Sequence, residues 1–373
     1  MDSAPAAGDH PAGCQALAWA RAYLPEGPGA AAVLGTLVRH SPGSLPGHLR
    51  GHLAADSATP WAGPVAPGRT HLPALPAGLL IWVQADHAPA LARCAPGGLQ
   101  PGESFLAPGL YLSGPRERPQ TLVHAPGADL TLAILRPEAW AGPLAAGWSA
   151  MRERIVALDP PEKPTRGLTS LPAMHGLDGT LRGRARAQAV EAMLLAAHTG
   201  AWAQAHADTD THARAYPSAP VPGREGPSPP GRSAGLAGWW QALDAQLVRR
   251  PVGQRQRERL ARAWTGLAPS RLRAHARAEA ALLHAAALLR SGQLDWRQVA
   301  LLAGYTDQPH LCRETRRLSG FSPVQLMRGM LGEDPFWIYR AWALARLERL
   351  QGRPGPVGMP LPGQAPASAV APA

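Results

Sequence analysis

The chain has 373 residues and a formal net charge of +11 at pH 7, and its apolar content rests mainly on Leu, Ala, Val and Trp. This length suits two domains, and no stretch reaches the ~18 uninterrupted apolar residues that a membrane-spanning helix needs. The first ten residues lack the basic start and apolar run of a secretory signal. The cysteines Cys14, Cys94 and Cys312 show neither Cys-x-x-Cys nor Cys/His spacing. We therefore expect a cytoplasmic protein with no metal, no cofactor and no membrane contact.

The N-terminal part divides at about residue 70. Residues 1–70 are rich in Pro, Gly and Ala, and we expect them to be irregular or poorly ordered. From residue 72 to about 144, short apolar runs (GLLIWVQA, ESFLAPGLYLSG, QTLVHA, DLTLAILRP) are separated by Pro and Gly, which favours strands. Residues 182–206 predict a helix with an apolar stripe at Ala189, Met193, Leu194 and Ala197. Residues 71–215 are thus predicted to be a β-rich domain with a helical C-terminal part.

The remaining chain is basic and helical. Residues 216–235, YPSAPVPGREGPSPPGRSAG, are expected to be a flexible linker, and residues 351–373 a disordered tail. Between residues 249 and 350 there are 18 arginines, no lysine and 8 acidic residues, a formal charge of +10 that leaves +1 for the rest. Such segregation is expected of an electrostatic footprint on nucleic acid. The predicted fold class is α+β, with a small β-rich N-terminal domain and an all-α domain at 236–350.

Residues 294–328 read LDWRQVALLAGYTDQPHLCRETRRLSGFSPVQLMR and predict two short helices joined by a tight turn. Asp295 is placed to cap the first helix, with Gln298 three residues later as in a capping box. Thr306 is suited to cap the second helix, and Asp307 to lie at its positive end. The residues predicted to face the core are Val299, Leu302 and Ala303 on the first helix and Leu311, Thr315 and Leu318 on the second.

The opposite face of the second helix is polar and bears arginine, which suits the major groove of DNA. It comprises Gln308, Pro309, Cys312, Arg313 and Arg316. The segment AGYTDQPHLCRETRRLSGFSPVQLMR resembles the second helix-turn-helix of the AraC family of bacterial transcription regulators. The resemblance is carried by the turn Gly304-Tyr305, the opening Asp307-Gln308 and the ending Gly320-Phe321-Ser322-Pro323. It implies two such units in one domain, here at about 235–330.

A shift of 54 residues reveals the second copy that the resemblance implies. WTGLAPSRL at 264–272 aligns with LSGFSPVQL at 318–326, so that Gly266 falls on Gly320 and Pro269 on Pro323. We call the second helix of each unit, which would enter the major groove, its reading helix. The reading helix of the first unit is then expected near residues 253–264, and its outward face comprises Gln254, Arg255, Glu258, Arg259 and Arg262. Residues 272–289 contain no Gly or Pro and predict one continuous helix. Such a helix would hold the two readers about one DNA turn apart, ~34 Å.

The chain departs from the family pattern beneath both reading helices. The family usually has an aromatic residue where this chain has Ala261 and Thr315. Arg257 stands in the first unit where Leu311 stands in the second, and a buried unpaired arginine is costly. Either Trp264 and its apolar neighbours repack beneath the first helix, or that unit contributes mainly phosphate contacts.

The resemblance implies a regulator that binds promoter DNA, and it assigns roles on the two outward faces. Arg259 and Arg313 are the expected base readers, because arginine donates a bidentate pair to guanine. The residues expected to set the remaining specificity are Gln254, Arg255, Glu258, Gln308 and Cys312. The residues expected to hold phosphate, which positions the protein without specifying sequence, are Arg262, Arg316 and Arg317.

Further partners follow from the same resemblance. LPALPAGLLIWVQ and LTLAILRPEAWAGPLA are similar to the β-rich N-terminal domains of some family members, which implies a sensor of a small-molecule effector or a dimerisation domain. The helix at 182–206 either packs on its own domain or joins a homodimer. The apolar helix at 332–350 either packs on the DNA-binding domain or contacts a dimer partner or RNA polymerase.

Two other functions compete with sequence-specific DNA binding. The first is a degenerate regulator that acts as a protein-interaction module, because the missing aromatics would loosen both helices. The second is an enzyme, a DNA alkylation-repair methyltransferase, which needs an activated cysteine. Cys14 and Cys94 lie in no cluster of basic or metal-ligating residues of the kind that such chemistry needs, so we expect no catalytic residue.

Overall fold

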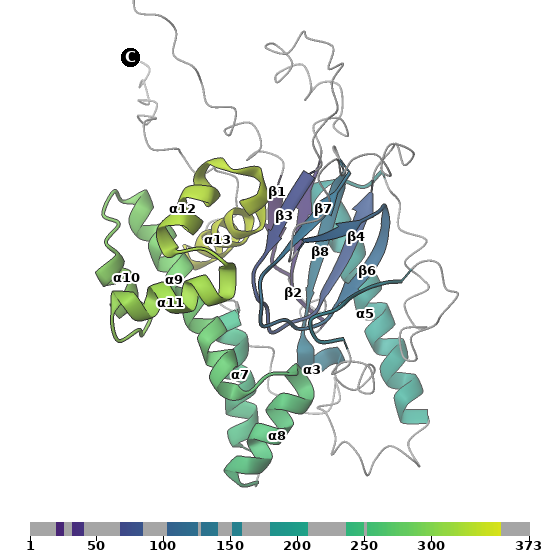
Figure 1. Cartoon of the computed structure of the whole chain (residues 1–373). Helices are drawn as coiled ribbons and strands as arrows, with labels where there is room; N and C mark the ends of the chain where they lie inside the picture. The colour runs from purple at the N-terminus through teal and green to yellow at the C-terminus, as the bar shows by residue number, and fades with distance from the viewer. Residues whose placement is uncertain are drawn as a thin grey trace, which may run out of the picture.

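The structure is a computed structural model that describes residues 20–25, 32–40, 68–84, 103–125, 128–140, 151–158, 180–207, 236–249 and 252–351. Its N-terminal half contains a six-stranded sheet in the order β1-β2-β8-β4-β6-β9 and a three-stranded sheet in the order β3-β7-β5 (Figure 1). The strands are β1 (Ala20–Tyr23), β2 (Val33–Arg39), β3 (Gly68–Leu72), β4 (Leu79–Gln84), β5 (Glu103–Leu106), β6 (Gly109–Ser113), β7 (Gln120–His124), β8 (Asp129–Leu135) and β9 (Ile155–Ala157). The larger sheet is antiparallel throughout, whereas β5 pairs with β7 in parallel.

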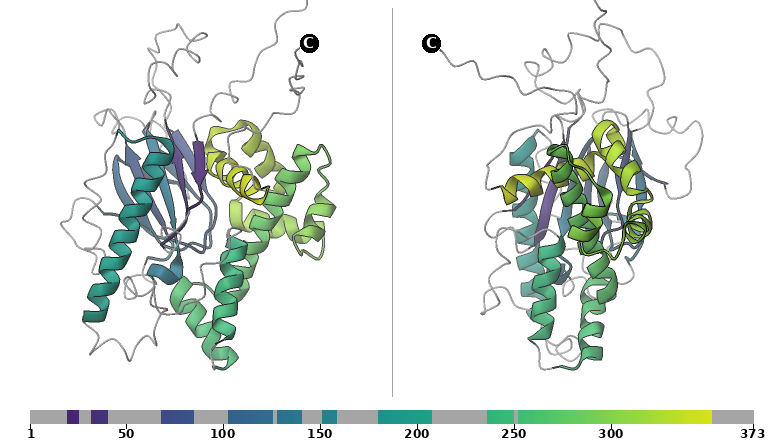
Figure 2. Two further views of the ribbon diagram at one scale, coloured as in Figure 1. Left: turned by 180° about the vertical axis from the view of Figure 1, so that it is seen from behind. Right: turned by 90° about the vertical axis from the view of Figure 1, so that its left-hand side faces the viewer.

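Both faces of the larger sheet are covered, and β8 shows why its sequence is apolar at nearly every position. All seven residues of β8, DLTLAIL, are buried. Leu130, Leu132 and Ile134 belong to one hydrophobic cluster, while Ala133 and Leu135, which alternate with them, belong to a second. Helix α5 (Gly183–Ala207) covers the second cluster, and the C-terminal helices lie on the opposite side of the sheet (Figure 2).

Two strands and the start of a third form inside the first 70 residues, where the composition predicted irregular structure. β2, VLGTLVR, lies between β1 and β8 and is buried at six of its seven positions. Gly35 within it is required by packing, because a Cβ at that position would lie 2.7 Å from Cζ3 of Trp342. The burial of this apolar run in the sheet therefore outweighs the preference of the surrounding Pro- and Gly-rich sequence for irregular structure.

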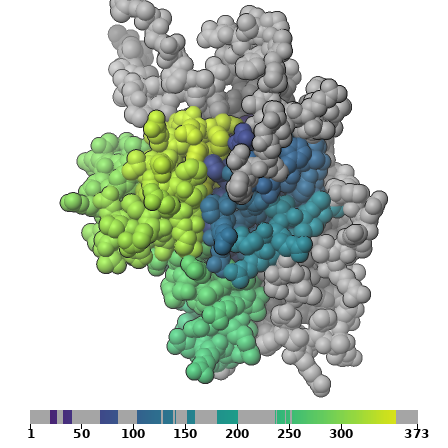
Figure 3. Space-filling model, viewed as in Figure 1, coloured from purple at the N-terminus to yellow at the C-terminus, as the bar shows by residue number. Residues whose placement is uncertain are grey.

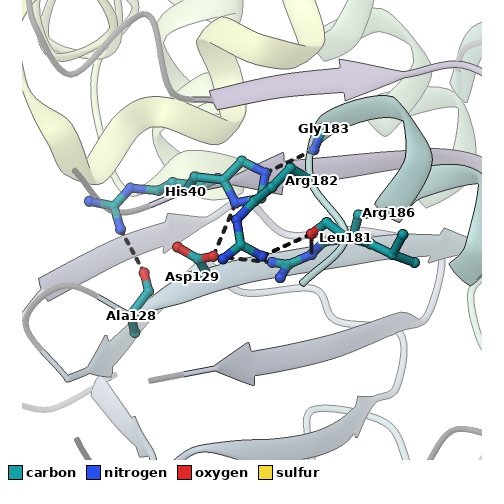
Figure 4. A network of polar contacts seen from close by, with 8 residues as sticks. His40, Ala128, Asp129, Leu181, Arg182, Gly183 and Arg186 are labelled. Atoms are coloured by element: carbon teal, nitrogen blue, oxygen red, sulfur yellow. Dashed lines mark hydrogen bonds and ion pairs between the residues drawn. The ribbon is translucent and has the colours of Figure 1, made fainter. Parts of the chain in front are cut away.

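A buried polar network attaches the N-terminus of α5 to the sheet (Figure 4). Oδ2 of Asp129, at the start of β8, lies 3.0 Å from Nδ1 of His40 and accepts from Nη1 of Arg186 at 3.4 Å. Nε2 of His40 accepts from the backbone amide of Gly183 at 2.9 Å. Nδ1 of His40 therefore carries the ring proton and donates the hydrogen bond to Asp129. Because the carboxylate contacts side chains from two other segments, His40 after β2 and Arg186 of α5, its buried charge is compensated on two sides.

Helix α5 packs on its own domain, which is one of the two interpretations offered by its sequence. Val190, Leu194 and Ala197 are buried in the cluster that it forms with the sheet. Ala189 and Met193, which were predicted on the same stripe, are only half-buried. The apolar stripe is therefore occupied within this chain along its described side chains.

The C-terminal half is helical, which confirms the predicted α+β fold class. Its helices are α7 (Leu236–Val248), α8 (Gln254–Thr265), α9 (Pro269–Arg290), α10 (Trp296–Leu302), α11 (Gln308–Ser319), α12 (Pro323–Gly332), the 3-10 turn η7 (Asp334–Phe336) and α13 (Trp337–Leu350); a short helix, α3 (Pro137–Trp140), belongs to the N-terminal half. Among the described helices, none has the length and apolar character that a bilayer crossing demands. The predicted linker at 216–235 and the tail at 352–373 lie outside the described residues.

One hydrophobic cluster runs through both halves, so they do not have wholly separate cores. It joins apolar residues of β2, β4 and β8 to Trp239, Trp264 and Trp337 of the helical half. Nε1 of Trp337 donates to Oγ1 of Thr70 at 3.0 Å, and Arg39 pairs with Asp334 at 2.7 Å. Helix α13 thus packs on the helical domain through α9, which is one of the alternatives that its sequence offered, and also against β1, β2 and β3 of the N-terminal half. The two halves form one continuous surface in Figure 3.

Candidate nucleic-acid interface

The second helix pair, α10 and α11, begins at two aspartate caps. The side chain of Asp295 accepts from the amide of Arg297 at 3.0 Å. Oδ1 of Asp307 accepts from the amide of His310 at 2.6 Å, so Asp307 is the cap of α11 and not Thr306 as predicted. A carboxylate in this position both satisfies an unpaired amide and offsets the positive end of the helix dipole.

The inner face of α11 lies where the sequence placed it, whereas that of α10 is shifted. Leu311, Thr315 and Leu318 are buried. On α10, Val299 and Ala303 are buried as predicted, but Leu302 is 50% exposed and its neighbour Leu301 is 76% exposed. Helix α10 has only seven residues, so its orientation is set by what it packs against more than by its own period.

Helix α11 is braced from behind by the turn and by α9. Oε2 of Glu314 accepts from Nη2 of Arg277 at 3.0 Å, and Oε1 accepts from the hydroxyl of Tyr305 at 3.1 Å. The guanidinium of Arg277 also lies over the Tyr305 ring, 5.4 Å from its centroid. Burial, followed by the charge of Glu314, raises the pKa of Tyr305, so the hydroxyl remains a donor at neutral pH.

The predicted outward faces of both reading helices lie at the surface. The exposed members are Gln254, Arg255, Arg259, Arg262, Pro309, Arg313 and Arg316, and the half-buried members are Glu258, Gln308 and Cys312. Gln254 donates to Oε1 of Glu258 at 3.5 Å. On each helix the arginines therefore extend into solvent from a polar face whose reverse side is packed.

Arg317 has a different environment from the other arginines proposed to contact DNA. Its side chain is half-buried, and its Nη2 is buried with no hydrogen-bond partner. Desolvation lowers the pKa of its guanidinium, and the neighbouring Arg271 adds to this effect. Glu117 of the N-terminal half is among the charges around it. Arg317 therefore lies towards the boundary between the two halves and not on the outward face.

The first helix pair, α7 and α8, keeps a packed underside despite Arg257. Nε of Arg257 donates to the carbonyl of Val252 at 3.1 Å, and the residue is only half-buried. The buried face of α8 consists instead of Leu260, Ala261 and Trp264, which join the shared cluster. The repacking around Trp264 that the sequence offered as one alternative is therefore present, and a role of this unit in phosphate contact stays a prediction.

The reading helices end alike and meet the same segment of the N-terminal half. Gly266 and Gly320 adopt left-handed conformations, with φ of 73° and 85°, after α8 and α11. A Cβ built on Gly266 would lie 3.5 Å from Pro115, and one built on Gly320 would lie 3.5 Å from Pro119. The amide of Ala74 donates to the carbonyl of Leu318 at 2.7 Å. The N-terminal half thus contacts the C-terminal ends of both reading helices.

Several exposed arginines of the helical half were not selected from the sequence. They are Arg249, Arg271, Arg273, Arg290, Arg297 and Arg328. Arg297 lines a surface hollow together with Gln308 and Cys312 of the reading helix. Arg297 is the second residue of α10, and this position could have identified it from the sequence. In a helix-turn-helix the start of the first helix lies near the second helix, which is the one expected to contact DNA.

In the ranges that the structure covers, no group of three or more His, Cys, Asp and Glu side chains could hold a metal ion. Cys312 is a free thiol on α11, and Cys14 and Cys94 lie outside the described residues.

Comparison with known proteins adds little. The chain matches no protein-family profile, and no curated protein matches it. A solved structure of ToxT from Vibrio cholerae aligns with a TM-score of 0.29 and 6% sequence identity, over 70% of this chain and 94% of that chain. A likeness this distant supports no argument about function.

Proposed function

We propose that the protein is a cytoplasmic, sequence-specific regulator of transcription of the AraC type that binds double-stranded DNA through α8 and α11. The observation that carries this proposal is the pair of 12-residue helices, each with a packed reverse side and an arginine-bearing outward face. A helix of this kind fits the major groove. The spacer α9 has 22 residues and is roughly 33 Å long, close to one turn of DNA.

The roles assigned to the outward faces follow the chemistry of each side chain. Arg259 and Arg313 read guanine, with Gln254, Arg255, Glu258, Gln308 and Cys312 adding specificity. Arg262 and Arg316 contact phosphate, and Arg297 is a further candidate for that role because it is exposed beside Gln308. Arg317 remains a proposed phosphate contact, although it would have to leave its half-buried place to reach DNA.

The first experiment identifies DNA sites with the full chain. Purified protein is used to capture genomic fragments, which are then sequenced, and the enriched site is tested for binding by gel shift. The full chain is required because Trp337 and other residues of the shared cluster would be exposed in a fragment from residue 236 onward. Enrichment of a common sequence motif is expected.

The second experiment tests the two faces. The double variant Arg259→Ala/Arg313→Ala should lose about 2–6 kcal/mol of binding free energy on the enriched site. Arg184→Ala removes an exposed arginine of α5 in the N-terminal half and serves as the matched control. Folded double-variant protein with wild-type affinity would contradict the proposal and favour a protein-interaction module.

A further inference from the structure

An apolar cavity lies between the larger sheet and the helical half. Its volume is about 130 Å³, and its walls come from both halves of the chain. Leu37 and Leu132 line it from the sheet, Ala285 from α9, and Leu318 from α11. An engineered apolar cavity of similar size, about 150 Å³, stays dry and binds benzene. A single aromatic ring is therefore the size of molecule that this cavity can hold.

The cavity lies directly beneath α11, the second reading helix. Comparison with the first repeat shows that α11 lacks an aromatic side chain at this place. Leu311, Thr315 and Leu318, the buried face of α11, all line it. In the 54-residue repeat, Leu318 corresponds to Trp264, whose indole is buried beneath α8. One reading helix thus rests on an aromatic ring of its own, whereas the other rests on a smaller side chain beside a cavity.

Two polar atoms of the lining have no partner. Nε2 of His275 and the hydroxyl of Tyr339 are both buried without a hydrogen bond. Burial lowers the pKa of His275 to about 3, so its imidazole is neutral, with one ring nitrogen protonated and the other able to accept. In the tautomer protonated on Nδ1, Nε2 is an acceptor, and a hydroxyl or N–H donor in the cavity would satisfy it.

The charge of the lining excludes an anion. Among the described residues the lining includes no Lys or Arg side chain. Its described carboxylate, Glu279, accepts from Nε1 of Trp342 at 2.7 Å and faces Arg346 at 3.8 Å. A buried carboxylate ligand would have no cation to pair with and would meet the negative charge of Glu279. A neutral ligand meets neither obstacle.

We propose that this cavity binds a neutral, single-ring aromatic compound bearing a hydroxyl group, which donates to Nε2 of His275. The ring supplies beneath α11 the aromatic bulk that Trp264 supplies beneath α8. Because the ligand contacts both halves, its binding stabilises their docked arrangement and the position of α11. Its effect on DNA affinity rests on the function proposed above, whereas binding itself does not.

Binding is tested on the full chain by calorimetry and thermal unfolding with three probes. Phenol should bind and raise the unfolding temperature, benzene should bind more weakly, and benzoate should not bind. If benzoate binds as well as phenol, the cavity does not select a neutral ligand and the proposal is wrong. If none of the three probes binds, the proposal is also wrong, and the cavity holds only water.

Two variants and one control locate the site. Ala285→Leu fills the cavity and should abolish phenol binding, while Ala287→Leu, at an exposed position of the same helix, should leave binding unchanged. His275→Leu removes the acceptor and should reduce the preference for phenol over benzene by about tenfold. This ratio is measured within one protein, so general destabilisation does not affect it. Unchanged binding in Ala285→Leu, or an unchanged ratio in His275→Leu, would overturn the proposed site.

The regulatory part has its own readout. Phenol should alter the affinity of the wild-type protein for its enriched DNA site and should have no effect on Ala285→Leu. Equal DNA affinity with and without phenol, in a protein that binds phenol, would refute the coupling to α11. Failure of DNA binding under all conditions, with phenol binding intact, would refute the proposed function and leave the ligand site standing.

Discussion

The hydroxyl groups of Thr265 and Ser319, 54 residues apart, occupy equivalent positions at the ends of the two reading helices. Each lies 2.7 Å from the carbonyl oxygen four residues earlier, in Ala261 or Thr315, and accepts at 3.1 Å from the amide two residues later. A left-handed glycine follows each hydroxyl residue. The repeat seen in the sequence is therefore also a repeat of hydrogen bonds, and it gives both helices the same exit into the next helix.

Salt should weaken DNA binding steeply if the arginine-rich helical half neutralises several phosphates. We expect a log–log slope of roughly −4 to −8 for the observed binding constant against salt concentration. Fluorescence anisotropy on the enriched DNA site over a salt series provides the measurement. A slope near zero would show that phosphate contacts do not drive binding.

Base reading and phosphate contact on α11 should be separable. Arg313→Ala is expected to cost about 1–3 kcal/mol on the enriched site and to relax preference at one or two base pairs. Arg316→Ala, at another exposed position of α11, should weaken binding to all sequences about equally. Affinities for the enriched site and for random DNA are compared. Equal losses on both DNAs in both variants would show that the roles are wrongly assigned.

The second unit should contribute more to sequence discrimination than the first. Helix α11 is capped by Asp307 and braced through Glu314 by Arg277 and Tyr305, whereas α8 begins at Gly253 without a side-chain cap. A helix fixed by a side-chain cap and by two bracing contacts discriminates better, because a wrong base cannot be accommodated by a small shift. Footprinting of Arg259→Ala and Arg313→Ala should show the larger loss of discrimination in the latter. The reverse order would make the first unit the main reader.

Acid should destabilise the fold through His124. Its Nε2 lies 3.2 Å from Oγ1 of Thr70, its Nδ1 lies 3.0 Å from the carbonyl of Ala125, and burial lowers its pKa to about 4. Above the unfolded value of about 6.5, both states are neutral and stability is complete. As pH falls from about 6.5 to about 4, the unfolded chain takes up a proton that the folded protein excludes, so stability falls.

The size of this effect can be measured with one substitution. Removing His124 should reduce the slope of unfolding free energy against pH by about 1.4 kcal/mol per pH unit in the middle of that window. His124→Asn retains a donor and an acceptor, and urea unfolding at several pH values gives both slopes. Identical slopes for the variant and the wild type would show that His124 is not the group responsible.

The two halves should unfold together. Trp337 is 0% exposed and lies in the shared cluster with its Nε1 on Thr70, so Trp337→Ala should cost about 3–5 kcal/mol. Circular dichroism at wavelengths dominated by helix and tryptophan fluorescence should report one coincident transition. Val324→Ala, at an exposed position of α12, should change stability by less than about 0.5 kcal/mol. Two separate transitions in the wild type would contradict the shared core.

The sequence by itself determined the elements whose signals are local. Asp295, Gly320 and the period of Leu311, Thr315 and Leu318 specify helix starts, ends and buried faces through atoms only a few residues apart. The apolar runs broken by Pro and Gly likewise predicted β4, β6, β7 and β8. The internal repeat followed from the sequence alone, because the same local constraints recur after 54 residues.

Only the tertiary structure decided which distant segments meet. The burial of β2, the exposure of Leu302 and the half-buried place of Arg317 each depend on a neighbour far along the chain. The shared core required Trp337 to reach Thr70, and the cavity beneath α11 arises where side chains from both halves leave a space. Local patterns fix the conformation of a segment, but burial and cavities are properties of the packed whole, in which non-local contacts outweigh local preference.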